Sequence, residues 1–138
     1  MVELIVTALL YLFLIPAVLL FLSRYLHENA HYIVLKKYFV KAKFPKFNFF
    51  SVNKGSFVEV IDNDAYDKLE WKRKVCVSLA GLITDFLLSL IFLTIYYYFK
   101  VDLWLYCGLF SVIFYTFIGT LAGRDRVQFL KAIRERNQ

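Results

Sequence analysis

The chain has 138 residues, of which 60% are hydrophobic and 20% aromatic, and its formal net charge is +6. The mean hydropathy is +0.57, and the apolar share exceeds the roughly 45–50% that is usual for soluble domains. This composition excludes an ordinary soluble domain, indicates an integral membrane protein and leaves no length for a separate soluble domain.

Three apolar segments are long enough to cross a bilayer core, which takes about 20 residues of helix. The apolar periodicity of the first continues past Arg24, so we expect one helix over about 2–37, kinked at Pro16. The second and third helices are expected over about 72–99 and 101–123. The predicted fold class is an α-helical membrane protein with three transmembrane helices and a short β-hairpin between helices 1 and 2, in one domain over 1–138.

The basic residues cluster beside these segments. Of the 17 Lys and Arg, 11 lie between Arg24 and Lys74 and five lie from Arg124 onward. The positive-inside bias therefore predicts a cytoplasmic first loop and a basic cytoplasmic tail over 124–138, with the N-terminus and the turn at Lys100 outside. We interpret this charge mostly as a topology signal, with a nucleic-acid-binding patch as the weaker interpretation, because the basic residues flank the membrane segments.

The loop over about 38–70 has a different character. Pro45 interrupts any helix, and aromatic and β-branched residues flank the turn-like sequence Asn53-Lys54-Gly55. We expect a hairpin at 46–61. Its edge strand could pair with an extended substrate segment, or its phenylalanines could anchor it in the membrane surface; the sequence supports both interpretations equally.

The sequence HENAH at 27–31 contains the chain's only two histidines. At this spacing His27 and His31 lie on one helix face and can bind a single Zn²⁺, with Glu28 beside them as the general base of a metalloprotease. Ionisable groups at membrane depth are costly and usually functional, which favours this interpretation over simple interfacial polar residues.

A catalytic zinc usually has three protein ligands and one open position. The carboxylates beside the predicted spans are Asp85 and Asp125, and the residue pattern alone does not choose between them. Glu59 and Glu70 are weaker candidates, and Asp102 is expected on the outer side.

With these motifs in this order, the chain resembles the site-2 protease family of intramembrane zinc metalloproteases. GSFVEV at 55–60 looks like the family's Gly-aromatic-Val strand, and Ala80 and Gly81 match the start of its Ala-Gly-Pro-x-x-Asn helix. The segment 117–130 occupies the position of the family's Asn-x-x-Pro…Asp-Gly segment. The resemblance covers nearly the whole chain and corresponds to the family's minimal three-helix core.

The resemblance implies one Zn²⁺ per chain, bound by His27, His31 and Asp125, with Glu28 as the catalytic base. It also implies substrate contacts, which we assign to Asp85, Gly81, Phe57 and Val58. The chain departs from the family pattern at Leu82 and Asp85, where Pro and Asn are usual, and at Gly119, Ala122 and Arg126, where Asn, Pro and Gly are usual.

The predicted function is hydrolysis of a peptide bond within or near a transmembrane segment of a membrane-protein substrate. The alternatives are a non-catalytic relative that binds transmembrane helices, a protease whose third ligand is Glu70, and a structural membrane protein with an accidental motif. The expected partners are a membrane-protein substrate and the lipid bilayer, and the lipid-facing surface is compatible with homo-oligomers.

Overall fold

The computed structural model describes residues 2–44, 58–113 and 124–136, and these are mostly helical. The helices are α1 (Val2–Leu9), the π-helix η1 (Leu10–Leu14), α2 (Ile15–Lys37), α3 (Asn63–Asp67), α4 (Trp71–Phe99), α5 (Asp102–Ser111) and α7 (Arg124–Glu135). The strands are β1 (Ala42–Lys43) and β2 (Glu59–Val60).

Two of the predicted long apolar helices are confirmed. Among the described residues, Ile5–Lys37 and Trp71–Phe99 are long and apolar enough to cross a membrane, and only 6% and 39% of their most apolar windows are buried inside the molecule. The core helix of a soluble protein would be mostly buried, so this exposure favours a lipid environment. α5 covers the first part of the third predicted span, but 114–123 lie outside the described residues, so the count of three spans stays a prediction.

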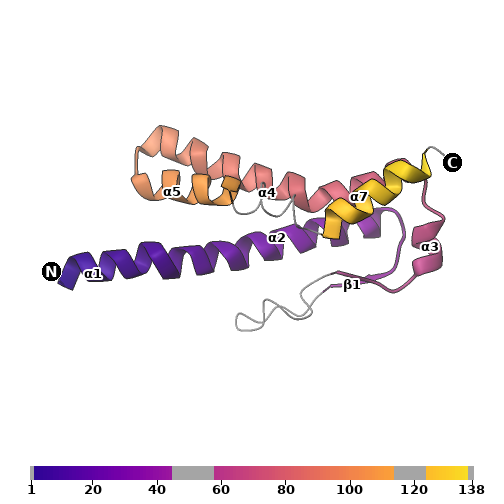
Figure 1. Cartoon of the computed structure of the whole chain (residues 1–138), viewed down its shortest axis with the longest axis horizontal. Coiled ribbons are helices and arrows are strands. Elements are labelled where there is room, and N and C mark those ends of the chain that lie inside the picture. Colours follow the sequence, from indigo (N-terminus) through magenta and orange to yellow (C-terminus); the bar gives the residue numbers. More distant parts are fainter. Residues whose placement is uncertain (1, 45–57, 114–123, 137–138) are drawn as a thin grey trace.

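The long helices run side by side along one axis (Figure 1). α1, η1 and α2 form one long helical run, α4 packs along α2, and α5 folds back onto α4. The predicted turn at Lys100 is confirmed: this residue adopts a left-handed conformation with φ 53°, which ends α4. The start of α1 and this turn lie at one end of the molecule, and α3 and α7 lie toward the other (Figure 1).

The first helical run contains a wider π-helical turn just before Pro16, where the sequence predicts a kink. Ile15 N–H bonds to the carbonyl of Leu10, the spacing of a π-turn. The next such bond would need an N–H from Pro16, which has none. The Tyr11 carbonyl instead accepts the hydroxyl of Tyr106 in α5 at 2.8 Å. This contact satisfies a backbone group that would be costly to leave unpaired in lipid.

Two apolar clusters hold the helices together. One joins α2, α4 and α5, and the other lies where α2 and α4 meet the sheet. The first consists of Leu19, Leu88, Phe92 and Cys107, and the second of Leu35, Val40 and Val77. Along α2, the residues between Leu19 and Leu35 include His27 and His31, so apolar packing on both sides fixes the part of the helix that carries the motif.

A two-stranded antiparallel sheet is present between the first two long helices, as predicted, with Ala42 paired to Val60. Its first strand, however, lies before Pro45, upstream of the predicted range 46–61. Ala42 and Val60 pack against the second apolar cluster, so tertiary packing selects this pairing. The predicted turn and Phe57 fall within 45–57, outside the described residues.

The predicted tail contains a helix. α7 packs against α4, where Ala132 is only 1% exposed. The buried Lys74 on α4 forms an ion pair of 2.7 Å with Glu135. α7 is therefore a docked element, and its first turn carries Asp125.

Candidate metal centre

The two histidines are oriented through their Nδ1 atoms. His31 Nδ1 lies 2.7 Å from the carbonyl oxygen of Val77, and His27 Nδ1 lies 2.7 Å from Oδ2 of Asp85. A carbonyl and an ionised carboxylate can only accept, so each Nδ1 donates its proton. In the neutral form of each ring, Nε2 then carries a lone pair, the arrangement typical of histidines that bind a metal.

Three acceptor atoms converge on one point. His27 Nε2 lies 3.1 Å from His31 Nε2 and 3.0 Å from Oδ2 of Asp125, and His31 Nε2 lies 3.4 Å from the same oxygen. A tetrahedral zinc with bonds of about 2.0–2.1 Å separates its ligands by about 3.3 Å. The spacing and the nitrogen and oxygen donors therefore fit Zn²⁺, and this group could hold a metal ion.

Asp125 is positioned by α7 and is partly exposed. Burial acts to raise the pKa of its carboxyl, but hydrogen bonds from His27 and His31 hold that pKa below the usual range. Without a metal, a proton on Nε2 provides these bonds. The carboxylate is thus ionised, which is the form that a metal requires, and a bound cation would replace the proton.

Asp85 lies on the other side of the His27 ring. Its side chain is buried, and its two oxygens contact Ser23 Oγ at 2.6 Å and His27 Nδ1 at 2.7 Å. Of the two carboxylates that the sequence left open, Asp125 is the one that reaches the Nε2 atoms. The predicted substrate contact of Asp85 stays a prediction.

Gly81 was also predicted to contact substrate. The structure places it against His27, because a Cβ at this position would overlap the imidazole ring. The absence of a side chain therefore lets α2 and α4 approach closely enough for His27 to reach Asp85. Any substrate contact of Gly81 remains a prediction.

Glu28 is buried beside the cluster, with 3% of the residue exposed. Its Oε2 accepts the backbone N–H of Val58 at 2.9 Å, and its Oε1 lies 3.4 Å from the guanidinium of Arg24. The predicted substrate residue Val58 thus lies next to the predicted base. Ser23 and Arg24 were not among the predicted site residues, although each lies one helical turn before a motif residue, which is a usable signal.

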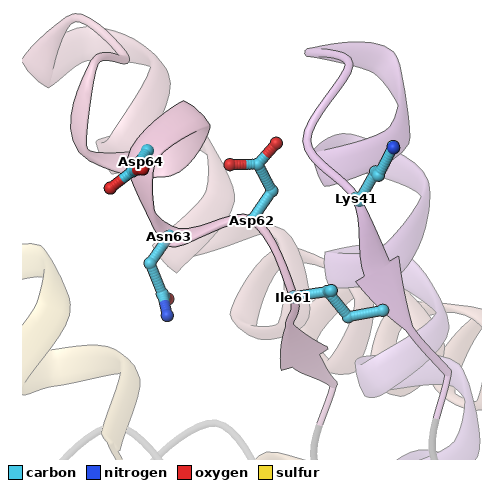
Figure 2. A pocket seen from close by; sticks show the side chains of 5 residues that line it. All are labelled: Lys41, Ile61, Asp62, Asn63 and Asp64. Atoms are coloured by element: carbon cyan, nitrogen blue, oxygen red, sulfur yellow. The ribbon is translucent and has the colours of Figure 1, made fainter.

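An open depression on the surface is separate from the metal cluster (Figure 2). It is lined by Lys41, Ile61, Asp62, Asn63 and Asp64. Asp62 caps α3 by accepting the N–H of Ala65 at 2.9 Å, so one of its acidic side chains has a structural function. No lining residue belongs to the metal cluster.

The long apolar helices, the histidine pair on α2 and the carboxylate on α7 are the elements of a membrane metallopeptidase core. In agreement, the sequence model of Peptidase family M50 matches residues 15–136, which include every residue of the cluster. The chain therefore belongs to peptidase family M50, the site-2 proteases, which are membrane-bound and use zinc. Comparisons with curated proteins and with solved structures gave no significant match.

Proposed function

We propose that the chain is an intramembrane zinc metalloprotease that cleaves a membrane-protein substrate within or near a transmembrane segment. His27, His31 and Asp125 would hold the Zn²⁺, and Glu28 would act as general base. The observation that carries this proposal is the convergence of three potential ligand atoms 3.0–3.4 Å apart, since one bound cation would hold all three together.

Each residue has a distinct part in the reaction. When bound, Zn²⁺ polarises the scissile carbonyl as a Lewis acid and lowers the pKa of water toward about 7. Glu28 takes the proton of the attacking water and passes it to the leaving amine. Arg24 and the Val58 N–H restrain the Glu28 carboxylate from two sides, so the base is held in place before substrate arrives.

The position along α2 supports a site at the edge of the bilayer. Arg24 is the first basic residue of the chain and precedes His27 by less than one helical turn. We infer that the apolar part of the helix lies in lipid and that cytoplasmic water reaches the motif. In this topology the N-terminus is outside, and the loop after α2 and the C-terminal segment are cytoplasmic.

The substrate must be extended before cleavage, because peptide bonds inside a helix are already paired. β2 begins one residue after Val58, whose N–H contacts the proposed base. We infer that this strand presents an unwound substrate segment by strand addition. Bilayer contact and self-association through the exposed apolar helices belong to the same proposal.

The first test is metal content. The full chain, purified in detergent, should contain one zinc per chain, and His27→Ala should lose it. Glu28→Gln should retain zinc, because Glu28 is not a ligand. A wild-type chain without zinc, or full zinc in His27→Ala, would contradict the metal site.

The second test is cleavage. A tagged single-span membrane protein is co-expressed with the wild type or with Glu28→Gln, and its fragments are followed by immunoblot. Loss of a general base lowers the rate by about 10²–10⁴, so the variant should give no visible product. Cleavage that persists in Glu28→Gln would remove Glu28 from its role. A wild type that binds zinc and associates with the tagged protein uncut would favour the non-catalytic alternative.

A further inference from the structure

Asp85 contacts the proposed ligand His27 on the side away from the metal cluster. We propose that Asp85 is a positioning residue, which fixes the His27 imidazole through Nδ1 and adds a negative charge behind the zinc. This inference rests on the proposed zinc site. It assigns Asp85 a function other than third ligand or substrate contact.

The geometry leaves the carboxylate little freedom. Ser23 and His27 lie one turn apart on α2, and each contacts one oxygen of Asp85 on α4, at 2.6 and 2.7 Å. Ser23 is 1% exposed and Asp85 4%, so no solvent competes for these bonds. Because both oxygens are occupied, Asp85 cannot turn without losing a donor, and the His27 ring is held with it.

The negative charge of Asp85 supports the positioning function, as its hydrogen-bond geometry does. An amide at this position could accept the same Nδ1 proton, yet the chain buries a carboxylate in an apolar bundle, where charge is costly. Together with Zn²⁺, the carboxylates of Asp85, Asp125 and Glu28 and the guanidinium of Arg24 balance to a neutral site. A carboxylate that accepts from a ligating histidine also makes the imidazole a stronger donor to the metal.

The competing explanation is a purely structural link between α2 and α4. Hydrogen bonds between membrane helices stabilise their packing, and such a link would affect stability alone. A positioning function instead predicts an effect on the metal. The two explanations therefore differ in zinc affinity and in the coordination spectrum.

The experiment compares the full chain with Asp85→Asn, which keeps shape and one acceptor but removes the charge. Zinc affinity is measured by chelator competition, and Co²⁺ is substituted to record its visible absorption. We expect zinc affinity to fall about 10–100-fold, the usual cost of losing such a partner, and the Co²⁺ bands to shift. Affinity within about twofold of wild type, with an unchanged Co²⁺ spectrum, would overturn the proposal.

Ser89→Ala is the matched control. Ser89 is fully buried one turn along α4, and its hydroxyl donates to the backbone carbonyl of Asp85 at 2.9 Å. This variant disturbs the same part of α4 without touching the His27 contact. It should retain the wild-type zinc affinity; an equal loss in both variants would instead indicate a general structural effect and would overturn the positioning function.

A measurement on the wild type covers the case in which Asp85→Asn does not fold. The chain has only two histidines, so ¹⁵N NMR of the zinc-loaded chain can follow both rings. We expect His27 to keep its proton on Nδ1 and to bind metal through Nε2. An unprotonated Nδ1 on His27 would overturn the inference, whereas a wild type that binds no zinc would overturn the proposed function instead.

Discussion

The two halves of the metal centre are built in different ways. His27 and His31 lie one turn apart on a single helix, so helix geometry alone sets their spacing. Asp125 lies 98 residues from His27 and arrives on a separate helix. Its side chain is 32% exposed, compared with 16% and 9% for the histidines. The histidine half of the metal centre, His27 and His31, is therefore formed within one helix and is the more buried of the two. The α7 half, Asp125, depends on the docking of α7.

α7 docks against α4 through a buried residue and an ion pair. Ala132 packs against the neighbouring helix and is almost fully buried, and the Lys74–Glu135 ion pair lies ten residues after Asp125. The α7 half should therefore be the easier one to weaken without unfolding the chain. Four variants test this difference between the halves.

Removal of Asp125 should have the largest effect on the metal. Asp125→Ala takes away the proposed third ligand, so zinc affinity should fall by at least about 100-fold, the upper end of the cost for losing an outer partner. Chelator competition on the purified chain measures this. Asp102→Ala, at the first turn of α5, serves as the control and should bind zinc normally. Full zinc binding by Asp125→Ala would mean that α7 provides no ligand.

The histidine half should be most sensitive at Gly81. In Gly81→Ala the new Cβ overlaps the His27 ring, so we expect a loss of about 1–3 kcal/mol in the free energy of unfolding together with weaker zinc binding. Gly108→Ala is the matched control, since its Cβ would lie 2.6 Å from the Leu93 side chain, between α4 and α5. It should cost stability but not zinc affinity, and equal zinc affinity in both variants would be evidence against a constraint on His27.

The ion pair should have a smaller effect, confined to the α7 half. Glu135→Gln leaves Lys74 buried without its charged partner; because Glu135 is 31% exposed, we expect a cost of about 1–2 kcal/mol, between exposed and buried pairs. Hydrogen exchange should then show faster opening of α7 than of α2, and zinc affinity should fall. The exchanged pair Lys74→Glu with Glu135→Lys should restore part of both. Equal exchange rates in α7 before and after Glu135→Gln would contradict the docking function.

The smallest effect on stability is expected for a substitution that lies far from both halves of the metal centre. Tyr106→Phe removes the hydroxyl that pairs with the Tyr11 carbonyl, and such bonds between membrane helices contribute about 0.6 kcal/mol on average. Thermal unfolding in detergent should shift slightly, while zinc affinity stays at the wild-type value. A change in zinc affinity would show that the η1 region is coupled to the metal centre.

The sequence predicted what depends on local geometry. The HENAH spacing, the two long apolar helices and the turn at Lys100 follow from residues close together in the chain. The choice between Asp85 and Asp125 does not, because each is an isolated carboxylate until α4 and α7 are packed against α2. The structure places the two on opposite nitrogens of the same ring, a distinction that no spacing rule contains.

Other differences between the predicted and the observed structure also arise from contacts between segments that are distant in the sequence. The charge of 124–138 indicated a tail, but α7 forms within it and docks through the buried Ala132 and an ion pair to Lys74. Strand β1 forms before Pro45 because Ala42 contacts the apolar cluster around Leu35. In each case a contact between distant segments decided the structure, and single-sequence patterns carry little information about such contacts.

The π-turn at Leu10–Leu14 has a consequence for how the chain tolerates length changes. A π-turn holds one residue more than an α-turn, so deleting a single residue there would yield a regular helix up to Pro16. Because the π-turn absorbs its extra residue in one wider turn, the segment before it would keep about the same orientation relative to the ligand face of α2. A length change of one residue at this point should therefore leave the phase between the outer part of the helix and the proposed metal-binding part nearly unchanged.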